Sequence, residues 1–172
     1  MTEQTPSPEI EYGPVGRRLV ALAYALAIAG GLLMSGLVVM VVISIVGRAL
    51  FSKPIYGDFE MVAMGTAVVI FLFLPHCHLQ RGNVIVDLFL ARAPEKVRAV
   101  CDAAGSLLLA VISGLLTWRM VLGAADLIEY HEVTMILGIP VWWAFPFIIL
   151  SLALLTLSCL YTMVRDLDKL RP

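Results

Sequence analysis

The chain has 172 residues, of which 60% are hydrophobic and 15% charged, and its mean hydropathy is +0.94. These values exclude an ordinary soluble domain and indicate an integral membrane protein, with membrane lipids as its first expected partner. Twelve basic and 13 acidic side chains give a net charge of -1, which leaves no excess charge for binding nucleic acid.

The first uncharged run covers residues 19–47 and follows an N-terminal tail over residues 1–18. A cleaved signal peptide has an apolar region of only about 7 to 15 residues. At about 1.5 Å per residue the run is roughly 44 Å long, against about 30 Å of hydrocarbon. We therefore expect a permanent, tilted transmembrane helix here.

Three further charge-poor segments predict spans over residues 61–79, 97–122 and 140–164. The last is placed to begin at Pro140, because proline is tolerated in the first turn of a helix and poorly inside it. The predicted fold is therefore all-α, with four transmembrane helices in a membrane domain over residues 19–165 and a C-terminal tail over residues 166–172.

The polar stretch RGNVIVD, residues 81–87, connects the second and third spans. Apolar residues at positions 84, 85, 88 and 89 fall on one face of a short helix, which we expect to lie in the membrane interface. Gly82 permits the turn, Arg81 is placed to meet lipid phosphate, and Asp87 is placed to pair with Arg92 or to cap local backbone.

Basic residues are distributed unevenly between the two sides of the predicted spans. The side with both tails and the second connection holds nine: Arg17, Arg18, Arg81, Arg92, Lys96, Arg98, Arg165, Lys169 and Arg171. The other side holds three: Arg48, Lys53 and Arg119. The positive-inside rule then predicts that both termini lie in the cytoplasm. Near the outer interface Trp142 and Trp143 form an aromatic belt, and Arg119 is an interface anchor.

Histidines are the strongest candidates for a metal or haem site. His76 and His78 are two positions apart and point about 200° from each other on a helix, whereas a chelating pair needs a spacing of three or four. His131 is expected on the opposite side of the bilayer. We expect no cofactor and no metal, and keep a haem- or metal-binding electron-transfer subunit using these three histidines as the alternative function. Cys77, Cys101 and Cys159 are interpreted as packing residues near cytoplasmic helix ends.

Transporters that act alone usually bury an ionisable group near the bilayer centre. The spans have no such group, and Arg119 comes nearest to one. An autonomous transporter depending on Arg119 is therefore a weaker possibility, and neither a nucleophile nor a catalytic pair indicates an enzyme.

Small residues recur at four-residue spacing on two of the predicted spans. One ridge comprises Ala23, Ala27, Gly31 and Ser35, and the other comprises Ser106, Ala110 and Gly114. Such ridges allow close approach of helix backbones in lipid, so we expect both to be helix interfaces.

Opposite charges flank the first outer connection. Arg48 ends the first span, and Asp58 with Glu60 begins the second, so a pair across this hairpin is expected.

Taken in order, these motifs resemble a known family. The set comprises Gly47 with Arg48, Pro54, GDFE at 57–60, RGNVIVD at 81–87, Glu132, Thr134, LGIPVWW at 137–143, and Pro146. Their order and spacing on four spans resemble the small, DctQ-type membrane subunit of tripartite ATP-independent periplasmic (TRAP) transporters. Asn83 departs from the histidine that many members have.

The resemblance implies that this chain is a non-catalytic subunit that works with two other proteins. It implies a large multi-span membrane subunit that carries the sodium and substrate sites, and a periplasmic substrate-binding protein that delivers an organic acid. The small subunit then scaffolds the large one. By position the resemblance assigns structural or interface roles to Arg48, Asp58, Glu60, Arg81, Gly82 and Asp87.

Overall fold

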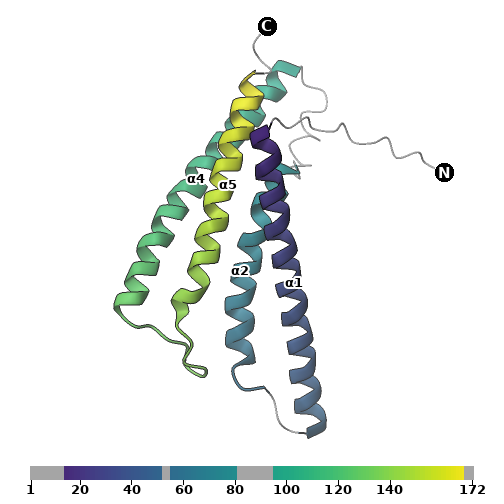
Figure 1. Ribbon diagram of the computed structural model, residues 1–172, viewed down its shortest axis with the longest axis vertical. Helices are drawn as coiled ribbons and strands as arrows, with labels where there is room; N and C mark the ends of the chain where they lie inside the picture. Colours follow the sequence, from purple (N-terminus) through teal and green to yellow (C-terminus); the bar gives the residue numbers. More distant parts are fainter. Residues whose placement is uncertain (1–13, 52–54, 81–94, 169–172) are drawn as a thin grey trace, which may run out of the picture.

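The computed structural model describes residues 14–51, 55–80 and 95–168 of the chain (Figure 1). Its helices are α1 (Pro14–Phe51), α2 (Asp58–Leu79), α4 (Glu95–Glu129) and α5 (Phe145–Asp168), and a short 3-10 helix, η1 (Val141–Ala144), leads into α5. Within these ranges there is no strand, only an isolated bridge between Val133 and Pro140. All four α-helices are long and apolar enough to cross a membrane, so the predicted all-α class with four spans is confirmed.

Most helix ends lie outside the predicted spans. α1 begins before residue 19 and ends after residue 47, and α4 continues to Glu129 instead of ending at residue 122. The first span was bounded by Arg18 and Arg48, but a helix continues past a charge once it leaves the hydrocarbon. The start of α5 differs in the other direction, because Pro140 precedes the 3-10 turn and the α-helix begins at Phe145.

The four helices differ greatly in length. α2 has 22 residues, about 33 Å, which matches a hydrocarbon layer of about 30 Å. α1 and α4 have 38 and 35 residues, about 57 and 52 Å, so both must tilt or protrude. Figure 1 shows α4 inclined across the others and α1 extending beyond α2.

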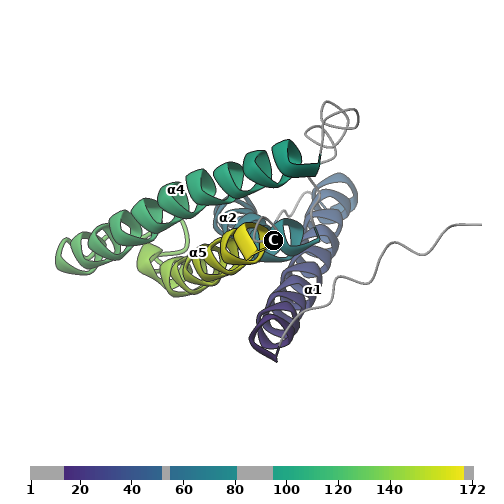
Figure 2. The same cartoon turned by 90° about the horizontal axis from the view of Figure 1, so that it is seen from above.

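The helices form an open layer instead of a closed bundle. The main contacts join α1 to α2, α2 to α5, and α5 to α4, while the described parts of α1 and α4 have no substantial contact. Figures 1 and 2 show the same order, with α1 and α4 at opposite edges. α2 and α5 are consequently the two inner helices; α5 is the more buried of them, and we call it the central helix.

The buried face of α1 follows a seven-residue repeat. Its members are Gly16, Ala23, Gly30, Leu37 and Ser44. Seven residues turn a helix by about 700°, close to two full turns, so these side chains stay on one side along the helix. Four of the five are small, which brings α1 close to its neighbours: a Cβ on Gly30 would lie 3.2 Å from Leu72 Cβ of α2.

The predicted ridge on α1 is only half used within the chain. Ala23 and Ala27 are buried, but Ser35 is exposed and a Cβ on Gly31 would meet nothing within 4 Å. Four residues turn a helix by about 400°, so the ridge drifts by about 120° between Ala23 and Ser35. Within this chain the ridge is therefore not one continuous contact, because Gly31 and Ser35 lie outside it, and their role as a helix interface stays a prediction.

The predicted ridge on α4 lies against α5. Ser106 and Ala110 are buried, and a Cβ on Gly114 would meet Thr156 of α5 at 3.7 Å. The main apolar cluster joins three helices: Val68 and Leu72 from α2, Ala110 from α4, and Ile148, Leu152, Leu155 and Cys159 from α5.

Several expectations concern residues outside the described ranges. These are the interfacial helix between the second and third spans, and the roles of Arg81, Gly82 and Asp87. Cytoplasmic placement of the termini stays a prediction.

Candidate functional site

Two connections, α1 to α2 and α4 to α5, lie at one end of the layer, which we call the connection end (Figure 1). There the predicted pair is present, with Arg48 Nη2 3.6 Å from Asp58 Oδ2. The buried Ser44 hydroxyl donates to the same Asp58 oxygen at 2.6 Å and accepts from the Ile55 amide at 3.4 Å. The Arg48 side chain is 64% exposed, so the pair adds little stability by itself, and Ser44 is the better-positioned partner of Asp58.

Glu60 has a different role from the one expected in the hairpin. Its two carboxylate oxygens accept from the amides of Ile136 and Leu137, at 2.9 and 3.0 Å. The first turn of α2 thereby holds the connection between α4 and α5. Sequence reasoning missed this contact because the partners are backbone groups 76 and 77 positions away.

The held segment, residues 130–140, is a compact turn that we call the α4–α5 hairpin. Thr134 organises it: its amide donates to Ile139 O at 2.9 Å, its hydroxyl accepts from the Ile139 amide, and its carbonyl accepts from Gly138. Gly138 has φ 64°, a conformation that glycine adopts without steric cost. The hairpin is therefore defined by its own hydrogen bonds as well as by Glu60.

Glu60→Gln is expected to loosen this hairpin, because a carboxamide offers one acceptor oxygen where the carboxylate offers two. Hydrogen exchange at the amides of Ile136 and Leu137 should become about tenfold faster. Glu129→Gln is the control, since Glu129 lies exposed at the end of α4 and exchange should stay unchanged there. Equal exchange rates in Glu60→Gln and the parent would contradict the role of Glu60 in holding the hairpin.

Gly57 of the GDFE motif connects these two parts. Its φ of 76° is left-handed, and a Cβ at this position would overlap the side chain of Leu137 in the hairpin. The motif thus needs glycine for two reasons, and Asp58 and Glu60 follow it in the first turn of α2, where acids suit the helix dipole.

In α2, Pro75 frees a backbone acceptor inside the layer. Proline has no amide hydrogen, so the carbonyl of Phe71, four residues earlier, loses its helical donor. The fully buried hydroxyl of Ser151 on α5 donates to that carbonyl. A defect in one helix is therefore satisfied by its neighbour, a common solution in membrane helices.

Hydroxyl groups also join α4 to α5. Thr156 Oγ1 lies within hydrogen-bond distance of Ser113 Oγ, at 2.9 Å, and Thr162 Oγ1 lies 3.4 Å from Ser106 Oγ. The sequence analysis missed these contacts. A usable signal was the seven-residue spacing of Ser106 and Ser113, which keeps both on one helix face.

The candidate metal ligands have separate neighbours. His78 Nε2 lies 3.0 Å from Thr162 Oγ1, while the His76 ring packs against Tyr24 with ring centroids 5.9 Å apart. His131 is in the α4–α5 hairpin, at the opposite end of α2. Over the described ranges no group of three His, Cys, Asp or Glu residues is arranged to hold a metal ion. The geometry therefore gives the haem or metal alternative no support.

The cysteines divide into two kinds. Cys159 is fully buried in the apolar cluster, as expected for a packing residue. Cys77 and Cys101 are exposed, so the packing interpretation was wrong for both. In a membrane helix a position outside the chain's own contacts faces lipid or another subunit.

The proposed interface anchors are placed as follows. Trp142 and Trp143 lie in η1 at the connection end, with ring centroids 6.3 Å apart and an edge-to-face angle of 69°. Arg119 is exposed. It lies on the side of α4 and not at its end, because the helix continues for ten more residues, to Glu129. Their roles as membrane anchors stay predictions.

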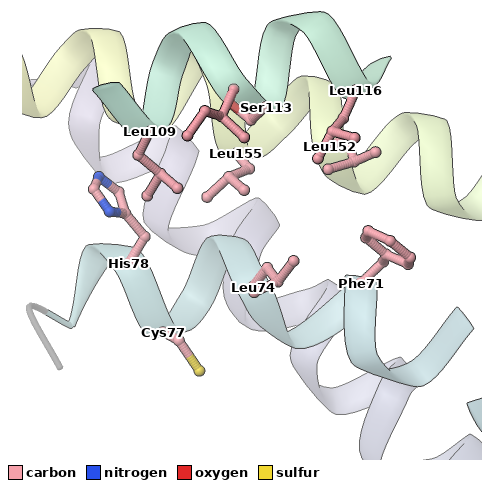
Figure 3. Close-up of a pocket in the computed structure, with 10 residues that line it drawn as sticks. Phe71, Leu74, Cys77, His78, Leu109, Ser113, Leu116, Leu152 and Leu155 are labelled. Carbon is pink, nitrogen blue, oxygen red and sulfur yellow. The ribbon is translucent and has the colours of Figure 1, made fainter. Parts of the chain in front are cut away.

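A groove of about 270 Å³ lies between α2 and α4 over α5 (Figure 3). Its walls include Phe71 and Leu74 from α2 and Leu109 and Leu116 from α4, with Leu152 and Leu155 at its base. Its polar members already have partners within the chain, since Ser113 bonds to Thr156 and His78 to Thr162. The groove suits an apolar occupant such as hydrocarbon or an apolar side chain.

Fold and site together define a multi-span membrane protein whose four helices form one braced layer. The chain matches the family model described as "Tripartite ATP-independent periplasmic transporters, DctQ component" over residues 37–169. This match covers most of the chain, so the protein belongs to the DctQ family, and the resemblance seen in its motifs is confirmed. Comparison with curated proteins and with solved structures gives no match.

Proposed function

We propose that the chain is the non-catalytic small permease subunit of a sodium-coupled TRAP transporter in the bacterial inner membrane. It scaffolds a large multi-span membrane subunit, which takes up an organic acid delivered by a periplasmic substrate-binding protein. In this arrangement the connection end faces the periplasm and both termini face the cytoplasm.

The observation that carries the proposal is the open layer. α1 and α4 are long enough to span, yet most of their apolar residues have no cover within the chain. Residues 19–47, 61–75, 103–118 and 133–164 carry no Asp, Glu, Lys or Arg that would bind an ion or an acid at mid-depth. Such a layer supplies wide apolar faces for another membrane protein, and the transported solute is bound elsewhere.

The hydrogen bonds between the helices support the same role. α5 is bonded to α2 through Ser151 and to α4 through Thr156, and Glu60 holds the connection between α4 and α5 to α2. A scaffold must keep its shape while the transport domain of its partner moves, and these contacts cross-link the layer at several depths.

Co-purification tests the proposal directly. The tagged chain, co-expressed with the large membrane subunit of its transporter, is expected to carry that subunit through two chromatography steps, and uptake in proteoliposomes should require both membrane proteins. Uptake of an organic acid by this chain alone would contradict the scaffold role.

Gly31 offers a sharper test of which surface is used. A Cβ at Gly31 would have nothing within 4 Å, so we expect Gly31→Leu to leave the fold of the chain intact. At a helix interface in lipid, leucine in place of glycine separates the backbones, and we expect about tenfold less co-purified large subunit. Gly105→Leu on α4 is the control, because a Cβ there also has nothing within 4 Å. Unchanged co-purification with Gly31→Leu would remove the outward face of α1 from the interface.

A further inference from the structure

The tip of the α4–α5 hairpin exposes two large apolar side chains. Met135 is 100% exposed and Ile136 is 62% exposed. Single exposed apolar residues are ordinary on protein surfaces. These two are adjacent, however, and lie on a segment that the rest of the chain holds in place.

The backbone of the tip is fixed before any partner arrives. Glu60 binds the amides of Ile136 and Leu137, and Thr134 closes the turn through Ile139 and Gly138. Leu137 packs over Gly57, so the hairpin is attached to α2 by side-chain contact as well. A loop that only connected α4 to α5 would not need its tip bonded to a third helix. Fixing a contact segment in advance reduces the entropy lost on binding.

The charged residues near the tip indicate what kind of partner would fit it. No lysine or arginine occurs between Arg119 and Arg165, and the acids of this region, Asp126, Glu129 and Glu132, are all exposed. Arg48, at the same end of the layer, lies 3.6 Å from Asp58. A loop that anchors to lipid headgroups normally carries basic residues that meet phosphate. An apolar tip beside acids is complementary instead to a protein surface with an apolar recess bordered by lysine or arginine.

We propose that Met135 and Ile136 form a docking tip for the periplasmic substrate-binding protein, which inserts them into an apolar recess bordered by basic residues. This inference rests on the proposed function, which places the hairpin on the periplasmic side. Glu60 is a positioning residue for the tip. The small apolar contact and the acidic surroundings suit a transient complex whose association depends on ionic strength.

The test uses the complex of both membrane subunits in nanodiscs and its purified binding protein. Met135→Ser with Ile136→Ser is expected to weaken binding about tenfold or more. The matched control is Leu50→Ser with Phe51→Ser, which changes two residues that are each 72% exposed at the same end of the layer, on α1. Binding by the parent complex should also weaken as salt is raised. An affinity within twofold of the parent for the Met135 and Ile136 variant would overturn the inference.

A second measurement separates protein docking from insertion into lipid. Met135→Cys, in a chain with Cys77→Ser, Cys101→Ser and Cys159→Ala, carries an environment-sensitive fluorophore. Docking predicts an emission shift when the binding protein is added. Emission that is already shifted in nanodiscs, quenched by brominated lipid and unchanged by the binding protein would overturn the inference in favour of a lipid contact.

Failure of the proposed function has a different signature. If the large subunit does not co-purify with the parent chain, both the scaffold role and the docking tip are contradicted. If it co-purifies equally with the parent and the tip variant, and both bind the binding protein equally, the docking tip alone is contradicted.

Discussion

Valine in place of Gly57 is expected to lower the free energy of unfolding by about 2 to 5 kcal/mol. The backbone there has φ 76°, which costs an L-residue about 1 to 2 kcal/mol, and more for a β-branched one. A side chain would also collide with Leu137, so the α4–α5 hairpin would have to move away from α2. Unfolding of the purified chain in mixed micelles, followed by circular dichroism, measures the change.

The control is Gly31→Val. Gly31 is helical, and a Cβ at that position meets nothing within 4 Å. Its free energy of unfolding should therefore change by less than about 1 kcal/mol. If Gly57→Val and Gly31→Val had the same effect, the left-handed turn and its contact with Leu137 would not matter for stability.

Removal of the Ser151 hydroxyl is expected to destabilise the layer by about 1 to 2 kcal/mol, because Ser151→Ala leaves the Phe71 carbonyl without a donor. Pro75→Ala restores an amide hydrogen at the position that normally bonds this carbonyl. In that background Ser151→Ala should have a much smaller effect. A double-mutant cycle on unfolding free energies is therefore expected to give a coupling of about 1 kcal/mol between two residues on different helices.

Ser158→Ala is the matched control for this cycle. Ser158 is as deeply buried as Ser151, but its hydroxyl donates to Leu154 of its own helix at 2.8 Å. Its coupling to Pro75 should be near zero. Additive effects of Ser151→Ala and Pro75→Ala would show that the hydroxyl does not compensate for the proline.

Both predictions concern how the layer is held together, which the proposed role requires. The Ser151 bond joins α2 to the central helix in the interior, and the Gly57 contact joins α2 to the α4–α5 hairpin at the connection end. Weakening either should make the outer faces of α1 and α4 a poorer platform for another subunit, since their relative position depends on α2 and α5.

The sequence by itself determined the class, the number of spans and the pair of Arg48 with Asp58. The first two follow from the length of apolar runs, because a bilayer imposes a minimum span that composition alone can meet. The pair was predictable because its members are ten positions apart across one short hairpin. Order and spacing of the motifs were also enough to indicate the family that the comparison then showed.

Only the tertiary structure decided which helix is central, which half of the α1 ridge is buried, and what Glu60 and Ser151 bind. Helices in lipid are apolar on all sides, so hydrophobic periodicity does not distinguish a lipid-facing side from a packed one. The deciding contacts join residues 76 to 80 positions apart, and their partners are backbone groups that carry no signal in the sequence. Packing of α5 between α2 and α4 brings Ser151 to Phe71, and folding of the α4–α5 hairpin over the start of α2 gives Glu60 its role.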